Sequence, residues 1–202
     1  MRLYTIMFIG LLIISNALFA DEETLLSGDF DHGGFGGPSV MLTQINGEGH
    51  VLVGGRGGWI INHTITIGGG GYGLSTEFSA EIETQSAGLV NALLNFGYGG
   101  FEMGYIHRSE RITHFEFHIL IGSGAVSWRE NGSGGIDTAD EYYQDGFFVL
   151  EPSAMLEINI VKWMRANLGV SYRYINNAAI PQIKESNLTG PSLLLGLKFG
   201  SF

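Results

Sequence analysis

Apolar and polar residues alternate with a period of two over most of the chain, which is the pattern of β-strands that have one apolar face. Residues 165–176 show this best. One face there is Ala166, Leu168, Val170, Tyr172 and Tyr174, and the other is Arg165, Asn167, Gly169, Ser171 and Arg173. The alternation predicts eight antiparallel strands and no helix. The predicted strands are residues 34–45, 49–61, 64–76, 90–106, 112–127, 146–160, 165–176 and 191–201.

The strand predicted at residues 90–106 changes parity along its length. Its apolar positions are Leu94, Phe96 and Tyr98, then Phe101, Met103 and Tyr105. Gly99 and Gly100 stand at the change, and glycine in this place predicts a β-bulge that inserts one residue. We expect a similar switch in the preceding strand, around residues 68–71.

The connections between the predicted strands differ in length. The short ones are His63, residues 108–111 and residues 161–164, and the long ones are residues 77–88, 129–145 and 177–190. Short turns at one end and longer loops at the other are typical of bacterial outer-membrane barrels. The short link near Gly47 is an exception to this pattern.

The first residues have the features of an export signal. Arg2 precedes an apolar run over residues 6–14, and Ala20 precedes the acidic residues Asp21–Glu23. This predicts a signal peptide at residues 1–20, an acidic lead-in at 21–32 and a β-barrel domain at 33–202. A retained anchor is the alternative, although the apolar run is too short to span a bilayer comfortably.

Composition narrows the classes of function. The chain has no Cys, which excludes disulfides, thiol catalysis and cysteine-ligated metal. Its net charge of −10 argues against nucleic acid as a partner. Its 32 glycines far exceed the usual share of ~7%, and they suit a tightly curved sheet.

The polar faces of the strands carry charges of both signs in equal number. These residues are Arg56, Glu102, Glu116, Glu151, Glu157, Arg165, Arg173 and Lys198. On a soluble protein they would face water, whereas in a membrane barrel they would line the interior. The bore of an eight-stranded barrel only just holds side chains, and balanced charges lower the cost of burying ions. We therefore predict an all-β, closed, up-and-down barrel with a polar, salt-bridged lumen.

The export signal, the strand alternation and the closing segment 190–202 resemble the small eight-stranded outer-membrane β-barrel proteins of Gram-negative bacteria. Trp59, Trp128 and Trp163 lie near strand ends, where such barrels carry aromatic girdles. The resemblance makes Phe199 and Phe202 candidates for the signal that the barrel-assembly machinery reads, with Phe199 in the parity that faces lipid. It implies outer-membrane lipid and this machinery as partners, and it says almost nothing about activity.

Candidate sites for chemistry are few. His114, Glu116 and His118 are metal-ligand types at sheet spacing, but three residues in a straight row do not converge on one ion without help. An interior polar network that includes them is therefore the preferred interpretation. Candidate nucleophiles are Ser127, Ser153 and Ser171, and nothing in their spacing ties them to a histidine. The acidic loop has Asp137, Asp140, Glu141 and Asp145, which are candidates for Ca²⁺ or for cation bridges to lipopolysaccharide.

The sequence thus predicts a non-enzymatic outer-membrane barrel without a cofactor, with a structural or surface-interaction role. The first alternative is a soluble secreted or periplasmic β-barrel or sandwich that acts as a binding module. The second is an outer-membrane enzyme that modifies lipid.

Overall fold

The computed structural model describes residues 31–84, 88–130 and 141–202. The predicted signal peptide, most of the acidic lead-in, and Asp137 and Asp140 lie outside the described residues. The strands are β1 (His32–Ile45), β2 (Glu48–Ile61), β3 (Ile65–Leu74), β4 (Ser79–Thr84), β5 (Gly88–His107), β6 (Thr113–Glu130), β7 (Glu141–Val161), β8 (Met164–Asn176), β9 (Ala179–Ile180), β10 (Ile183–Lys184) and β11 (Gly190–Ser201), and a short helix, α2, covers Glu185–Leu188. No helix in this part of the chain is long and apolar enough to cross a membrane.

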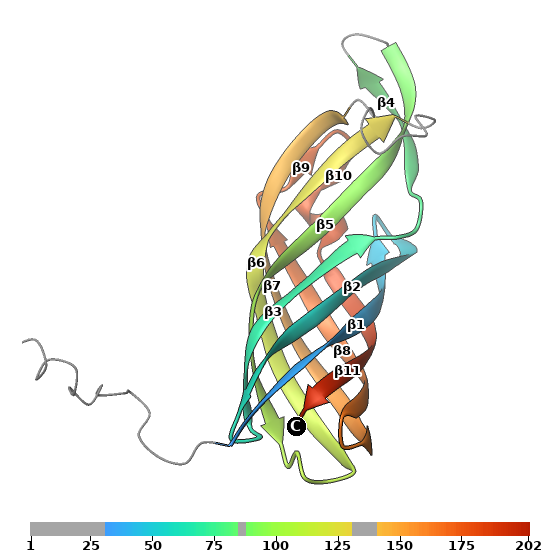
Figure 1. The fold of residues 1–202 in the computed structure, drawn as a ribbon. Helices are drawn as coiled ribbons and strands as arrows, with labels where there is room; N and C mark the ends of the chain where they lie inside the picture. Colours follow the sequence, from blue (N-terminus) through green and yellow to red (C-terminus); the bar gives the residue numbers. More distant parts are fainter. Residues whose placement is uncertain (1–30, 85–87, 131–140) are drawn as a thin grey trace, which may run out of the picture. The chain divides into compact units, whose positions relative to one another are not determined.

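Eight strands close into an antiparallel barrel (Figure 1). Their order around the ring is β3, β2, β1, β11, β8, β7, β6 and β5, and β5 pairs with β3 to complete it. β4 pairs with the part of β5 that continues past its pairing with β3. The predicted fold class and the eight predicted strands are confirmed, with ends that differ by a few residues. β4, β9, β10 and α2 fall in segments that were predicted as loops.

The barrel has a short-turn end and a long-loop end. His32 pairs with Ile61 and Gly34 pairs with Ser201, so β1 begins and β11 ends beside the short turn at residues 62–64. The turns at residues 108–112 and 162–163 lie at this same end. The opposite end carries the connections from β3 to β5, from β6 to β7 and from β8 to β11.

Large apolar side chains cover the outside of the barrel. Val170 is 58% exposed, Leu195 is 44% exposed and Leu156 is 37% exposed. The charged residues of the opposite face are buried, and none of the eight is more than 5% exposed. A soluble barrel or sandwich would pack the apolar residues at its centre. The observed inversion is that of a membrane barrel, whose apolar side chains face lipid.

The predicted β-bulges at residues 99–100 and 68–71 are wrong. The pairing of β5 with β3 and with β6 runs through Gly99 and Gly100 without a shift in register. Tyr98 and Glu102 therefore both point into the barrel, while Phe101 points out. Glycine is needed here for space: a Cβ on Gly100 would lie 2.3 Å from the carbonyl oxygen of Ile121. A register shift is found instead between Ser127 and Trp128, where β6 pairs with β7.

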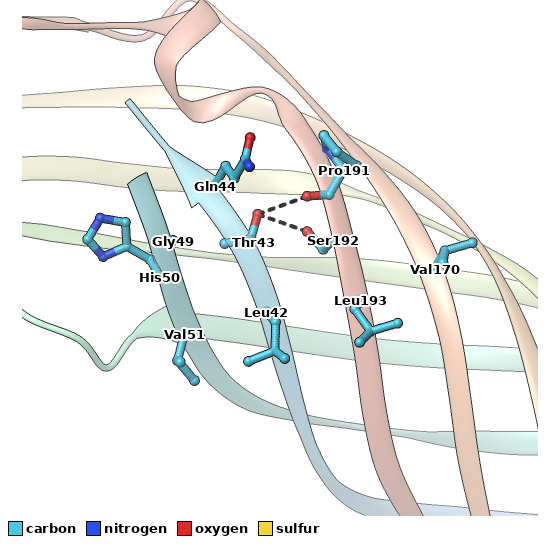
Figure 2. A pocket seen from close by; sticks show the side chains of 10 residues that line it. All are labelled: Leu42, Thr43, Gln44, Gly49, His50, Val51, Val170, Pro191, Ser192 and Leu193. Carbon is cyan, nitrogen blue, oxygen red and sulfur yellow. Dashed lines mark hydrogen bonds between the residues drawn. The ribbon is translucent and has the colours of Figure 1, made fainter. Parts of the chain in front are cut away.

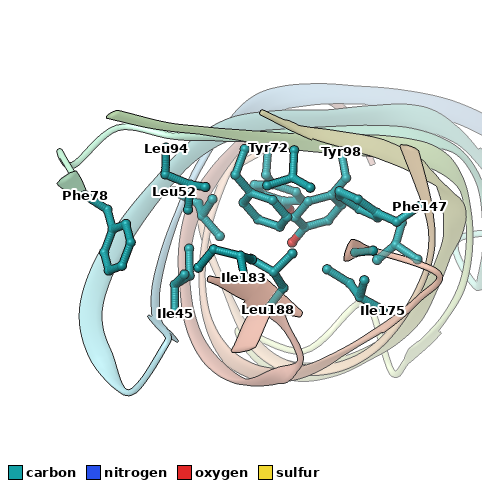
Figure 3. Close-up of a cluster of buried hydrophobic side chains, with 14 of the residues drawn as sticks. Ile45, Leu52, Tyr72, Phe78, Leu94, Tyr98, Phe147, Ile175, Ile183 and Leu188 are labelled. Carbon is teal, nitrogen blue, oxygen red and sulfur yellow. The ribbon is translucent and has the colours of Figure 1, made fainter. Parts of the chain in front are cut away.

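The interior has two layers, and the predicted polar, salt-bridged lumen describes only one of them. Most of the buried charged residues lie in the half near the short-turn end. The other half is an apolar core that includes Tyr72, Leu94 and Phe147 and continues into the β8–β11 connection through Ile183 and Leu188 (Figure 3). Trp128 belongs to this core, because it is 0% exposed and its ring stacks on Phe78. Its prediction as a girdle residue was wrong, whereas Trp59 and Trp163 are exposed on the outside.

Candidate functional site

The half of the interior near the short-turn end contains a continuous ionic cluster. Arg56 Nε donates to Glu102 Oε2 at 2.7 Å, and its Nη1 donates to Glu116 Oε2 at 3.0 Å. Lys198 Nζ reaches the same Glu116 oxygen at 2.7 Å. Arg56 and Lys198 also lie over the ring of Phe35, with 5.4 and 4.6 Å to its centroid. The strands β1, β2, β5, β6 and β11 thus meet in one set of contacts.

Glu157 on β7 extends this cluster toward the short-turn end. Its carboxylate forms ion pairs with Lys198 and, at 3.5 Å, with Arg165 Nη1. His114 Nε2 lies 3.1 Å from Glu157 Oε2, and His114 Nδ1 lies 3.1 Å from the carbonyl oxygen of Arg111. Arg165 lies over the ring of Phe202 at 4.1 Å.

The cluster is neutral when its formal charges are counted. Its cations are Arg56, Arg165 and Lys198, and its carboxylates are Glu102, Glu116 and Glu157. An unpaired ion buried at this depth would cost several kcal/mol, and pairing with good geometry offsets much of that cost. The network therefore fills the bore with side chains that hold one another in place.

The other two predicted lumen charges contact residues of the apolar core and are not paired with each other. Arg173 lies over the rings of Phe96 and Tyr98, with 5.2 and 5.6 Å to their centroids. Glu151 accepts hydrogen bonds from Tyr98 Oη at 2.6 Å and from Ser171 Oγ. Arg173 donates from Nε to the carbonyl oxygen of Leu188 at 2.8 Å and from Nη2 to Thr43 Oγ1 at 3.2 Å. Arg173 thus connects the barrel wall to α2 in the β8–β11 connection.

The connection between β8 and β11, residues 177–189, closes the mouth at the long-loop end and is called the plug below. Ile183 and Leu188 of the plug are 1% and 0% exposed. Trp128 Nε1 donates to the carbonyl oxygen of Pro181 at 2.9 Å, and Ala179 N donates to Asp145 Oδ2 at 2.9 Å.

Further bonds join the plug to the remaining neighbours. Asn46 N donates to the carbonyl oxygen of Asn187 at 2.9 Å, and the Gln182 side chain donates to the carbonyl oxygen of Glu81. The plug is therefore fixed to the β1–β2 turn and to β4, as well as to β6 and β7.

Phe202 lies at the other mouth of the barrel. It packs against the buried cluster of Phe35, Ile60 and Ile106. Phe199 instead faces outward, where its ring stacks on Trp163 with 6.1 Å between centroids. The two candidate residues for an assembly signal therefore lie on different sides of the wall.

The candidate chemical residues face the interior and have separate partners. His114 contacts Glu157, whereas Glu116 contacts Arg56 and Lys198. The described residues contain no group of three His, Cys, Asp or Glu side chains that could hold a metal ion. Among the candidate nucleophiles, Ser171 is bonded to Glu151.

A shallow hollow lies beside β1, β2 and β11 near the long-loop end (Figure 2). Leu42, Val51 and Leu193 are among the residues that line it. Thr43 Oγ1 donates to the carbonyl oxygen of Pro191 at 3.2 Å and accepts from Ser192 Oγ at 3.0 Å, so these polar groups are already paired. His50 is the titratable residue in this lining, and its Nδ1 lies 2.9 Å from Thr76 Oγ1. The hollow offers no set of groups that would perform catalysis.

Sequence reasoning missed the plug and the apolar half of the interior. The signal for the plug was present, because Ile180, Ile183 and Leu188 are apolar residues in a segment interpreted as a surface loop. For the apolar half, Leu94 and Phe96 have the same parity as Glu102, but their apolar character was taken to mean that they face outward.

The comparisons with known proteins identify the fold. No protein-family model matches the sequence, and no curated protein matches it. The structure is similar to Neisserial surface protein A, with a TM-score of 0.55 and 9% identity over 85% of this chain and 99% of that one. It is also similar to Ail, the attachment invasion locus protein of Yersinia pestis, in its complex with the heparin analogue sucrose octasulfate. The TM-score is 0.52, with 11% identity over 86% of this chain and 99% of Ail.

The likeness to these structures agrees with what the chain itself displays. Its eight strands form a closed ring, its apolar side chains cover the outside, and its ions are paired inside. This chain therefore has the fold of the small eight-stranded outer-membrane β-barrel proteins.

Proposed function

We propose that the protein is a non-conducting barrel that presents a rigid, acidic surface outside the cell for contact with a cationic partner. The observation that carries the proposal is the plug, which folds into the mouth and bonds to the β1–β2 turn, β4, β6 and β7. A loop held in this way loses little further conformational entropy when a partner binds to it.

The absence of conduction is supported by the filling of the bore at three depths. The plug occupies the outer mouth, the ionic cluster occupies the inner half, and Phe202 packs at the opposite mouth. A steady ion current would require all three to move together. We expect no steady conductance from the pure protein in a planar lipid bilayer, and a large constant current would contradict this part of the proposal.

The charge of the long-loop end supports the choice of a cationic partner. Among its described side chains, the acidic ones are Glu48, Glu77, Glu81, Glu83, Asp145 and Glu185, and the basic ones are Arg129 and Lys184. This excess of negative charge creates a potential that attracts cations and repels polyanions. Ail binds a sulfated heparin analogue in its crystal, and we propose the opposite preference for this chain.

Binding to charged matrices tests the proposed surface. The protein in neutral detergent is passed over immobilised polylysine and immobilised heparin at low salt. We expect retention on polylysine alone, and we expect the triple variant E77Q/E81Q/E83Q to elute at distinctly lower salt. The control is Glu110→Gln, which removes an exposed carboxylate at the short-turn end. Retention on heparin, or equal elution of the triple variant and the native protein, would refute the proposed preference.

A further inference from the structure

The turn between β5 and β6 places two arginines beside the lipid-facing wall. Arg108 and Arg111 are exposed, and neither forms an ion pair with another residue that the structure describes. Together with His107, Ile112 and Phe115 they line a hollow at the short-turn end. The hollow therefore combines free positive charge with apolar side chains at the level where water meets lipid.

The backbone of this turn is held firmly by β7. Asn159 Nδ2 donates to the carbonyl oxygens of Ser109 and Arg111, at 3.0 and 2.8 Å. Asn159 N also donates to the carbonyl oxygen of Ile112 at 2.8 Å. The two guanidinium groups thus project from a fixed backbone, so binding an anion there does not require the turn to be ordered first.

An apolar groove continues from this hollow along the outer wall. It is lined by residues of β3, β5 and β6, among them Ile67, Met103 and Phe117. The two hollows adjoin, because His107 pairs with Phe115 and the next outward pair along the same strands is Tyr105 with Phe117. Successive outward residues lie roughly 7 Å apart along a strand. One lipid is therefore long enough for its headgroup to occupy the charged hollow while an acyl chain lies in the apolar groove.

We propose that this surface binds one anionic phospholipid of the leaflet that faces the periplasm. Arg108 and Arg111 bind its phosphate, and one acyl chain lies in the groove between Ile67 and Phe117. Phosphate suits a pair of guanidinium groups, since each group can donate two parallel hydrogen bonds to it. An anionic phospholipid also lacks the cationic choline group that would lie beside the two arginines. The short turns of outer-membrane barrels face the periplasm, which gives this site access to phospholipid rather than to lipopolysaccharide.

Native mass spectrometry of the detergent-solubilised protein tests the proposal. Phosphatidylglycerol, phosphatidylcholine with the same acyl chains, and lipid A are added separately at equal concentration. We expect phosphatidylglycerol to be retained about tenfold better than phosphatidylcholine, which corresponds to ~1.4 kcal/mol. The double variant R108Q/R111Q should lose this preference. Lys162→Gln, which removes an exposed cation from the β7–β8 turn, should keep it.

A second variant tests the groove separately from the charge. Ile67→Trp fills the groove and should weaken the retention of both phospholipids, whereas Leu168→Trp, on β8 elsewhere on the outer wall, should not. Circular dichroism establishes that each variant is folded before it is compared. Unchanged preference in R108Q/R111Q, unchanged retention in Ile67→Trp, or stronger retention of lipid A than of phosphatidylglycerol would each overturn the proposal.

Discussion

Lys198 is the residue that joins the two carboxylates at the centre of the ionic cluster. Its ammonium group contacts both Glu116 and Glu157, and the Lys198 side chain is 1% exposed. The stability of this buried cluster depends on each of its charged residues. Removal of one cation leaves two carboxylates short of positive charge in a place that water does not reach.

Lys198→Met should therefore lower the free energy of unfolding by about 3–5 kcal/mol, because it keeps the bulk of the side chain and removes its charge. Urea titration of the barrel in lipid vesicles measures this change. The control is Lys162→Met on an exposed turn, for which we expect a change within ~0.5 kcal/mol. Equal unfolding midpoints for the two variants would show that the cluster contributes little. Adding Glu116→Gln to Lys198→Met should recover part of the loss.

Glycines inside and outside the wall have different roles. A Cβ on Gly100, which faces inward, would lie 2.3 Å from a backbone oxygen of β6, whereas a Cβ on Gly36 would meet nothing within 4 Å. Gly100→Ala should cost about 1–3 kcal/mol in stability, because two paired strands must move apart. Gly36→Ala should change it by less than ~0.5 kcal/mol. The same urea titration compares them, and equal effects would mean that the close approach is not needed.

At the scale of strands, the sequence predicts the extent of a strand and its lipid-facing side wherever apolar and polar residues alternate. β7, β8 and β11 have one apolar and one polar face, so the period of two marks both their extent and the side that faces lipid. In β5 that signal fails, because Leu94 and Phe96 point into an apolar part of the interior while Phe101 and Met103 point at lipid. When both faces of a strand are apolar, alternation does not show which side chains point inward. The change of parity in β5 was therefore wrongly interpreted as a β-bulge at Gly99 and Gly100.

The loops could not be predicted from alternation at all. β4 is a strand because it pairs with the extension of β5, and the plug is ordered by bonds to segments far from it in sequence, such as Asn46 and Glu81. Such contacts depend on the closed ring, which brings these segments together. The eight charged residues of the polar face were identified from sequence, but their partners depend on register, which sequence alone did not provide.

At the scale of the whole molecule, the three tryptophans report how the barrel sits in lipid. Trp59 and Trp163 are 46% and 60% exposed on the outer wall, while Trp128 is 0% exposed beneath the plug. Brominated lipids quench indoles that touch them. In vesicles of such lipids, the variant that retains Trp128 alone should keep most of its fluorescence, and the variants that retain Trp59 or Trp163 alone should lose a large fraction. Equal quenching of all three would contradict the proposed exterior.

The position of Lys198 has a consequence for biogenesis. This residue lies on β11, and it neutralises Glu116 on β6 and Glu157 on β7. A partly folded chain in which β11 has not yet paired with β1 and β8 would hold those two carboxylates without Lys198 as their counter-charge. Pairing of β11 removes this electrostatic penalty, so closure of the ring should be cooperative, and forms with an open ring should be short-lived.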